Sequence, residues 1–189
     1  GHADALSIQA FRNGKKILTD PGTWNYHLYE NLRDLLRSTA WHSTVYVTGR
    51  NQSEMLGPFL WGRRAQTRLL DIREDESGVT IRTQTQYDKI RHTRTLCFDL
   101  ARTLTVEDAL EGLEAGKDAR KNFALAPDLQ LRLERNRCTA ANADGGVTLT
   151  TAADDGWETA EYIYSKAYNH REKAVRVSSR ADSKTEIRF

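Results

Sequence analysis

The chain has 189 residues, 39% of them hydrophobic, which is enough for one well-buried core, so we expect a single domain over residues 1–189. Its 28 basic and 26 acidic residues are interspersed and leave a formal net charge of only +2, which argues against nucleic acid as a partner. No run approaches the roughly 18 apolar residues of a membrane span, so no membrane-spanning segment is expected.

The first predicted element is a β-hairpin near the start of the chain. Residues alternate between apolar and other types from Leu6 to Ala10, and the apolar pattern resumes at Ile17-Leu18. The Asn13-Gly14 pair between these segments favours a type I′ turn, because both central residues of that turn need a positive φ.

One short helix is predicted after this hairpin. The Asp20-Pro21-Gly22 sequence is typical of a turn. Beyond it, Leu32, Leu35 and Leu36 recur at helical spacing, with charged residues on the other side. We expect this helix near Tyr29–Leu36 and no other substantial helix.

Short strands are predicted along the rest of the chain. Hydrophobic residues mostly recur at every second position, and turn sequences such as Asp75-Glu76-Ser77-Gly78 separate the segments. The expected strands are Val45–Val47, Thr67–Ile72, Val79–Thr85, Thr93–Phe98, Leu104–Leu110, Asn122–Leu125, Leu129–Leu133, Val147–Leu149, Ala160–Tyr164 and Ala174–Val177. Many short strands with regular turns predict an all-β fold, a two-sheet antiparallel β-sandwich.

The two cysteines and the arginine-rich stretches are given structural interpretations. Cys97 and Cys138 lack the CxxC or CxxH spacing of a metal or redox motif, so we expect buried free thiols, and a disulfide between them stays open as an alternative. The stretches 91–94 and 132–137 are interpreted as solvated faces of strands, with phosphate binding as the weaker alternative.

Three potential metal ligands each stand where one predicted element gives way to the next. His2 precedes the hairpin, Asp20 opens the turn after it, and His42 follows the helix. Two imidazoles and one carboxylate suit a divalent ion such as zinc, with a fourth position left for water or substrate. Each residue also has a purely structural interpretation: His2 as a terminal residue, Asp20 as the start of a turn, and His42 as a core histidine.

Four segments at the start of the chain form distinctive motifs. They are Gly1-His2-Ala3-Asp4-Ala5-Leu6-Ser7, Leu18-Thr19-Asp20-Pro21-Gly22-Thr23, Arg37-Ser38-Thr39-Ala40-Trp41-His42-Ser43-Thr44-Val45, and Asn51-Gln52-Ser53-Glu54 with Gly57-Pro58-Phe59-Leu60-Trp61-Gly62. Weaker similarities lie at 123–127 and 165–172. In these motifs the chain resembles, over nearly its whole length, the C-terminal β-sheet domain of the heparinase II/III-like family of bacterial polysaccharide lyases.

This resemblance implies a function for the longer protein. Members of the family pair an N-terminal helical toroid with the β domain and cleave uronic-acid-containing glycans by β-elimination in the cleft between the two. The resemblance implies that 1–189 is the β domain of such a chain without its toroid, that His2, Asp20 and His42 bind a divalent metal, most suitably zinc, and that the protein is periplasmic or secreted.

The resemblance also implies what this chain lacks. In the family a histidine commonly precedes the Gly-His-Ala-Asp motif, and a tyrosine acid/base and an Asn/His pair belong to the toroid, so no catalytic residue is expected here and the isolated domain should be inactive. Ser43 stands where asparagine is usual. We expect Arg37, Gln52, Trp61 and Arg63 to contact an anionic polysaccharide.

Two other functions compete with this interpretation. The first is a glycan-binding or structural β module that binds no metal. The second is a jelly-roll iron oxygenase, because His2-Ala3-Asp4 together with His170 imitates a triad of two histidines and one carboxylate. Loss of metal binding in an Asp4 variant but not in an Asp20 variant would favour the oxygenase.

Overall fold

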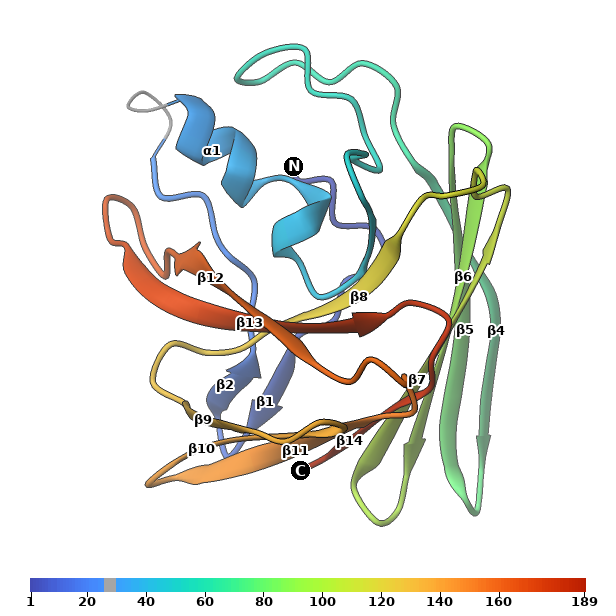
Figure 1. The fold of residues 1–189 in the computed structure, drawn as a ribbon, viewed down its shortest axis with the longest axis vertical. Coiled ribbons are helices and arrows are strands. Elements are labelled where there is room, and N and C mark those ends of the chain that lie inside the picture. Colours follow the sequence, from blue (N-terminus) through green and yellow to red (C-terminus); the bar gives the residue numbers. More distant parts are fainter. Residues whose placement is uncertain (26–29) are drawn as a thin grey trace.

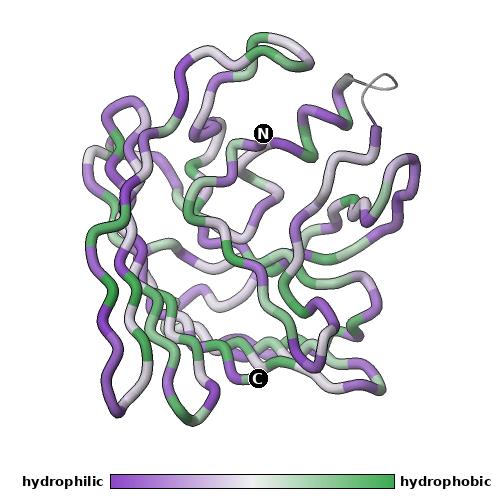
Figure 2. Tube along the Cα trace, turned by 180° about the vertical axis from the view of Figure 1, so that it is seen from behind, coloured by the Kyte–Doolittle hydropathy of each residue, from purple (hydrophilic) through white to green (hydrophobic). Residues whose placement is uncertain are grey.

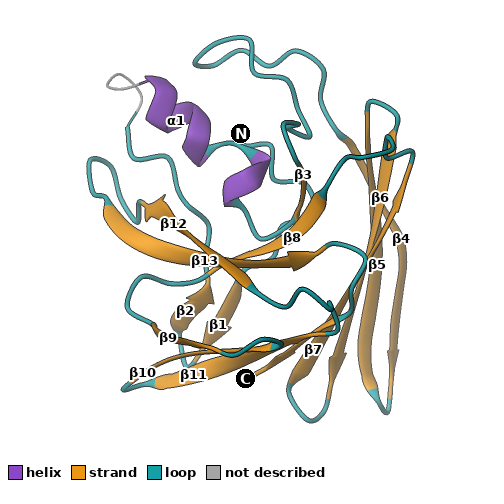
Figure 3. Ribbon diagram, viewed as in Figure 1, coloured by secondary structure: helices purple, strands orange, loops and turns teal. Residues whose placement is uncertain are grey.

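The computed structural model describes residues 1–25 and 30–189, in which antiparallel strands form two main sheets and a separate hairpin (Figure 1, Figure 3). The hairpin pairs β1 (Ala10–Arg12) with β2 (Lys15–Leu18). Asn13 and Gly14 in its turn have φ angles of 50° and 75°, as a type I′ turn requires.

The larger sheet has eight strands and the smaller sheet has four. In spatial order the larger sheet consists of β4 (Gln66–Asp75), β5 (Gly78–Tyr87), β6 (Ile90–Asp99), β7 (Thr103–Glu111), β14 (Thr185–Arg188), β11 (Gly145–Thr151), β10 (Arg137–Asn142) and β9 (Gln130–Leu133). The smaller sheet consists of β12 (Glu158–Tyr164), β13 (Glu172–Arg180), β8 (Ala119–Ala124) and β3 (Val45–Val47).

The main core lies between the two sheets. Val106, Leu149 and Ile187 from the larger sheet pack with Phe123 and Val177 from the smaller sheet, and all five are buried. The hairpin adds two further apolar side chains to this cluster, Ile17 and Leu18. The predicted all-β, two-sheet sandwich is therefore confirmed.

The helical residues lie at the end of the sandwich that carries the N-terminus (Figure 1). The helix α1 spans Glu30–Leu36, and the predicted first residue, Tyr29, falls outside the described residues. Leu36 is fully buried whereas Leu35 is 46% exposed, so the helix buries fewer of its leucine side chains than their spacing predicts. A 3-10 turn, Thr39–Trp41, follows and leads directly into His42.

Two strands, β10 and β14, were not predicted from the sequence. The apolar residues of β10 are small, and β14 has only one, Ile187, so neither segment has a strong alternating pattern. Their inward positions nevertheless pack well: Cys138 and Ala140 on β10 and Ile187 on β14 are fully buried. Hydrophilic and hydrophobic residues are interspersed along the chain (Figure 2).

The cysteines are both free, so the disulfide alternative is wrong. Cys138 is buried as expected, and burial raises the pKa of its thiol to about 12. The expectation of burial fails for Cys97, which is exposed. It follows Leu96, which packs against the core, and successive strand residues point to opposite faces of a sheet.

The two arginine-rich stretches also contain both exposed and buried side chains. Arg91 is exposed and forms an ion pair with Glu111 at 2.7 Å, and Arg132 is also exposed, in agreement with a solvated face. Arg94 contradicts that interpretation, because its side chain is fully buried. Within the described residues, no helix has the length and apolar character that crossing a membrane would require.

Arg94 belongs to a cluster of titratable side chains in the core, here called the buried ion cluster. Its other members are Asp108, Lys121 and His92, and all four side chains are inaccessible to solvent. Asp108 accepts hydrogen bonds from His92 Nε2 at 2.6 Å and Arg94 Nε at 2.7 Å, and Lys121 Nζ lies 3.2 Å from its other oxygen. Burial alone would raise the pKa of Asp108, but these partners outweigh it and hold the pKa well below its ordinary value.

The same cluster predicts how stability depends on pH. Burial lowers the pKa of His92 more than its contact with Asp108 raises it, so the folded chain takes up this proton at a lower pH than the unfolded chain does. As the pH falls below about 6.5, the unfolded state binds more protons. The free energy of unfolding should then fall by up to about 1.4 kcal/mol per pH unit until the folded-state pKa is passed.

Urea denaturation between pH 7.5 and 5.5, with a chelator present, measures this slope. His92→Gln removes the titrating group, so its slope should be shallower than that of the parent chain. A free energy of unfolding that rises as the solution becomes more acidic would contradict the buried, neutral state of His92.

Candidate metal centre

Three segments that are distant in the sequence bring His2, Asp20 and His42 together, and we call these residues the His/Asp cluster. His2 Nδ1 lies 3.0 Å from His42 Nε2, and His42 Nε2 lies 3.2 Å from Asp20 Oδ2. The third separation, between His2 Nδ1 and Asp20 Oδ1, is 4.0 Å. The His42 side chain is fully buried, whereas those of His2 and Asp20 are 16% and 25% exposed, so the cluster has one side open to solvent.

Backbone and hydroxyl hydrogen bonds hold the first segment against the segment around the 3-10 turn. Ala3 N donates to the Arg37 carbonyl at 2.9 Å, and Thr39 Oγ1 donates to the Ala3 carbonyl at 2.7 Å. Thr44 Oγ1 donates to the Ala5 carbonyl at 2.8 Å. These contacts lie on both sides of His42 in the sequence, so they fix the position of His2 relative to it.

The hydrogen bonds of the two imidazoles suit a bound cation. His42 Nδ1 lies 2.8 Å from the Ser38 carbonyl, which can only accept, so Nδ1 carries the proton and the Nε2 lone pair faces the cluster. That lone pair faces an Asp20 oxygen, which is also an acceptor. The other His2 nitrogen, Nε2, lies 3.3 Å from Thr23 Oγ1. Each histidine thus has an oxygen partner that orients its ring, the arrangement common at protein-bound metals.

The charge states also favour metal binding. Burial lowers the pKa of His2, and the neighbouring His42 lowers it further, which outweighs the acidic groups nearby. Burial raises the pKa of Asp20, but the adjacent His42 ring and the Gly22 N–H outweigh burial, so the net shift is downward. Neutral imidazole and ionised carboxylate are the forms that bind a metal.

Asp4 is a fourth oxygen donor in this region. One ligand atom from each of His2, Asp4, Asp20 and His42 can be chosen so that all lie within 4.8 Å of one another. Asp4 was not predicted to lie with Asp20, although its position two residues after His2 was a usable signal. The oxygenase interpretation needs His170 at the same site, and the described cluster does not contain it.

A tight turn positions Asp20. Gly22 N donates to Asp20 Oδ1 at 2.8 Å, and Gly22 has a φ of 78°, a conformation that side-chain-bearing residues rarely adopt. A Cβ atom at position 22 would also collide with the Ser165 carbonyl oxygen. Only glycine therefore fits this position without a shift of the backbone that carries the Asp20 carboxylate.

We expect Gly22→Ala to lower the free energy of unfolding by more than about 2 kcal/mol, because left-handed strain and overpacking act together. Zinc affinity should fall as well, since Asp20 loses its fixed orientation. Gly14→Ala is the matched control: its φ is 75°, but no atom lies within 4 Å of an added Cβ. It should lose only about 1 kcal/mol from strain. Equal losses in urea denaturation would contradict the close packing at Gly22.

Beside the His/Asp cluster lies a cavity of about 330 Å³, here called the arginine cavity. Its lining includes His2, Arg33, Arg37, Phe59, Trp61 and Arg64. The Arg33 guanidinium lies 4.4 Å from the centre of the Phe59 ring, and that of Arg37 lies 4.8 Å from the centre of the Trp61 ring. Such stacking stabilises cations against aromatic faces. The cavity therefore combines positive charge with flat apolar surface next to the cluster.

The four residues predicted to contact a glycan lie in different surroundings. Arg37 and Trp61 line the arginine cavity, but Arg37 already donates to Asp34 Oδ1 at 2.9 Å and to the Gly57 carbonyl at 2.8 Å. Gln52 is 1% exposed and its side-chain amide donates to a backbone carbonyl. Arg63 forms an ion pair with Asp88 at 2.6 Å and does not line the cavity.

Sequence reasoning missed Arg33 and Arg64. Arg33 stands four residues before Arg37, a spacing that brings side chains to one side of a helix, so this signal was available. Arg64 is exposed and follows Arg63 directly, and nothing in the sequence separates the two arginines.

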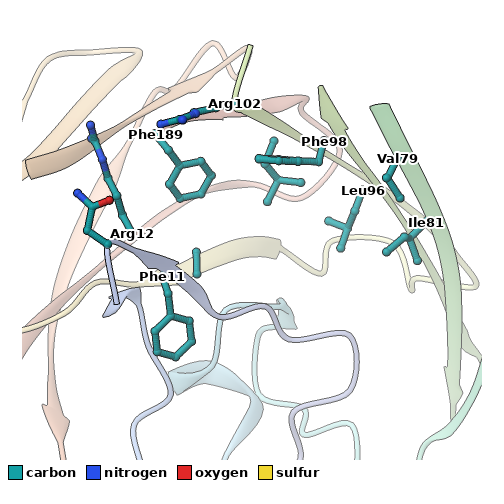
Figure 4. A pocket seen from close by; sticks show the side chains of 11 residues that line it. Phe11, Arg12, Val79, Ile81, Leu96, Phe98, Arg102 and Phe189 are labelled. Atoms are coloured by element: carbon teal, nitrogen blue, oxygen red, sulfur yellow. The ribbon is translucent and has the colours of Figure 1, made fainter. Parts of the chain in front are cut away.

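An apolar cavity of about 520 Å³ lies elsewhere, between the β1–β2 hairpin and the larger sheet (Figure 4). Phe11, Leu96, Phe98 and Phe189 are among its lining residues. Its lining contains no histidine, cysteine or acidic residue. It therefore offers neither metal ligands nor a carboxylate or imidazole base, and the His/Asp cluster remains the better candidate for a functional site.

The fold and the site together define a β-sandwich domain that carries a two-histidine, one-carboxylate cluster and a cationic, aromatic cavity at one end. The family model described as "Heparinase II/III-like, C-terminal" matches residues 1–189, and the chain belongs to this family, which is a family of polysaccharide lyases. No curated protein matches the chain at a significant level.

Solved structures of this kind share the fold. Heparan sulfate lyase HepC from Pedobacter heparinus is 19% identical to the chain, with a TM-score of 0.81 over 100% of this chain and 30% of that one. A heparinase III gene product is 20% identical, with a TM-score of 0.80 over 99% of this chain and 30% of that one. The chain thus spans about 30% of the length of these structures.

Proposed function

We propose that residues 1–189 form one domain of a longer bacterial polysaccharide lyase, which is periplasmic or secreted and cleaves uronic-acid-containing glycans by β-elimination. In this proposal an N-terminal helical toroid supplies the catalytic groups and the other wall of the substrate cleft. The observation that carries the proposal is the convergence of His2, Asp20 and His42 beside the arginine cavity, in a chain of the heparinase II/III-like family.

The His/Asp cluster is proposed to hold a divalent metal, most suitably zinc, because two imidazole nitrogens and a carboxylate match its preferred ligands. A bound ion would supply a fixed positive charge. His2, Asp20 and His42 come from three separate segments, so their shared ligation would tie the start of the chain to the Asp20 turn and to the residues after the 3-10 turn. The metal would thereby stabilise the wall of the cleft.

The arginine cavity is proposed to face an anionic glycan. β-Elimination places growing negative charge on the uronate carboxylate when the neighbouring proton is removed, and cationic donors stabilise that charge. Arg64 is the exposed cation of the cavity, whereas Arg37 mainly holds the loop at 57–58 in place. Trp61 adds a flat ring on which a sugar can stack.

The test uses the parent lyase, with its toroid, and measures the ultraviolet absorbance of the unsaturated product. Arg64→Met should raise KM for the glycan by roughly tenfold, as loss of one charge-assisted hydrogen bond predicts. Arg68→Met is the matched control, because Arg68 is also exposed but donates to Gln84 on β5. The 189-residue chain alone should release no unsaturated product.

Three outcomes would count against the proposal. Equal KM values for the two arginine variants would remove the arginine cavity from the substrate cleft. Eliminase activity of the isolated chain would contradict the assignment of the catalytic groups to the toroid. Glycan binding with no stoichiometric metal in the purified protein would favour the metal-free binding module instead.

A further inference from the structure

The buried ion cluster has no part in the proposed function, and its burial calls for a reason. His92 and Arg94 project from β6, Asp108 from β7 and Lys121 from β8, so the cluster bridges the two sheets. Removing charges from water is so unfavourable that well-packed apolar residues often stabilise a core equally well or better. Stability alone therefore does not account for this arrangement.

Arg94 donates hydrogen bonds to two backbone carbonyls as well as to the Asp108 carboxylate. Asp108 is its direct cross-strand partner and holds the guanidinium in a two-point contact, with Nε at 2.7 Å and Nη2 at 3.1 Å from the two oxygens. This contact fixes the plane of the guanidinium. It leaves Nη1 directed toward two backbone carbonyls, those of Leu6 at 2.7 Å and Ser43 at 2.9 Å.

These two carbonyls belong to the segments that carry the histidines of the candidate metal centre. Ser43 directly follows His42, and Leu6 lies four residues after His2. Leu6 also has a φ of 60°, a strained conformation for a leucine, which persists only where surrounding contacts hold it. The Arg94 donor supplies one such contact at the point where the first segment bends.

Lys121 and His92 also contact the Asp108 carboxylate, His92 Nε2 at 2.6 Å and Lys121 Nζ at 3.2 Å. Lys121 Nζ donates to the carbonyls of Val106 at 3.1 Å and Ser183 at 2.7 Å. It thereby anchors the cluster to both sheets near Asp108. The carboxylate that orients Arg94 is thus itself held between β6, β7 and β8, which makes the guanidinium a rigid fixed point.

We propose that Arg94, oriented by Asp108, is a positioning residue that sets the separation of His2 and His42 for metal binding. This inference rests on the metal centre of the proposed function. Arg94 acts by holding the backbone carbonyls of Leu6 and Ser43, and it does not contact the metal. Only an arginine can bind these carbonyls and the Asp108 carboxylate at the same time, so a lysine, with one positive charge but no planar guanidinium, should not replace it.

The test compares Arg94→Lys with Arg120→Lys in the 189-residue chain. Arg120 is a matched control, because its side chain is only 12% exposed and its ion pairs join it to Asp155 and Glu158, neither of which lies in the segments that carry His2 and His42. Zinc affinity is measured by competition with a chromophoric chelator, and near-ultraviolet circular dichroism verifies that each variant is folded.

Arg94→Lys should weaken zinc binding at least tenfold, as for other groups that orient metal ligands, whereas Arg120→Lys should stay within twofold of the parent chain. The visible absorption of the cobalt-loaded protein should change only in Arg94→Lys, because that spectrum reports ligand geometry. Unchanged affinity and an unchanged cobalt spectrum in folded Arg94→Lys would overturn the inference and leave the metal centre intact.

A measurement on the unmodified chain decides the question if Arg94→Lys does not fold. The side-chain Nε–H signal of Arg94 in nuclear magnetic resonance should shift during zinc titration, with the same midpoint as the His42 ring signals, and the Arg120 signal should not move. An Arg94 signal that ignores bound zinc would overturn the positioning role. Failure of the unmodified chain to bind zinc at all would instead overturn the metal centre on which the role depends.

Discussion

Replacing His42 with alanine should abolish the stabilisation that zinc gives to the chain. Zinc at a hundredfold excess over its dissociation constant adds about 2.7 kcal/mol to the free energy of unfolding. For a domain of this size that corresponds to a rise in Tm of roughly 5–10 °C. His42 is the fully buried member of the His/Asp cluster, and its Nε2 lies close to both other ligands, so its removal leaves no complete site.

The quantity to compare is the zinc-dependent change in Tm, measured by calorimetry with zinc and with a chelator. This difference cancels any loss of stability that the substitution causes in the metal-free chain. His170→Ala is the control, because His170 lies outside the described cluster, and it should retain the full zinc-dependent shift. The metal assignment fails if His42→Ala keeps that shift.

Asp108→Ala should destabilise the chain by about 3–5 kcal/mol, because it leaves Arg94 and Lys121 buried without their counter-charge. Arg94 Nε and Lys121 Nζ lie 2.7 Å and 3.2 Å from the Asp108 carboxylate, and among the described residues no ion pair joins either cation to another acidic side chain. Urea denaturation at neutral pH gives the free energy directly.

A matched surface variant separates this effect from the general loss of an ion pair. Glu161 and Lys173 form a pair at 3.1 Å with side chains 71% and 76% exposed, so Glu161→Ala should change the free energy of unfolding by less than about 0.5 kcal/mol. A loss below about 1 kcal/mol for Asp108→Ala would show that the buried charges are compensated in another way.

The strands and the proximity of His2, Asp20 and His42 could both be expected from the sequence, but for different reasons. Alternation is a local property, so residues such as Val45 and Val47 or the β5 and β6 segments reveal their strands without knowledge of the fold. The juxtaposition of His2, Asp20 and His42 was expected because each follows or precedes a predicted element within a family motif. Their hydrogen-bond partners, Ser38 and Thr23, were not, because ring orientation depends on packing.

Arg94 shows where such reasoning stopped. Charge type suggested a solvated face, although Ile90, His92, Arg94 and Leu96 occupy alternate positions and therefore share one side of β6. The alternation of side chains along β6 indicated that Arg94 faces the same side as Leu96, whereas its charge suggested a solvated position. The partner that makes burial tolerable, Lys121, lies on the other sheet, and no local pattern links it to Arg94. Buried charges of this kind become predictable only when the sheets are placed against each other.

X-ray absorption spectroscopy of the zinc-loaded chain tests the central claim most directly, because it counts the ligand atoms around the ion. The three-ligand site of His2, Asp20 and His42 predicts one zinc per chain with two imidazole nitrogens at about 2.0–2.1 Å and carboxylate or water oxygen at about 2.0–2.2 Å. A spectrum with no imidazole scattering, or a zinc content far below one per chain, would contradict a metal centre built from these three side chains.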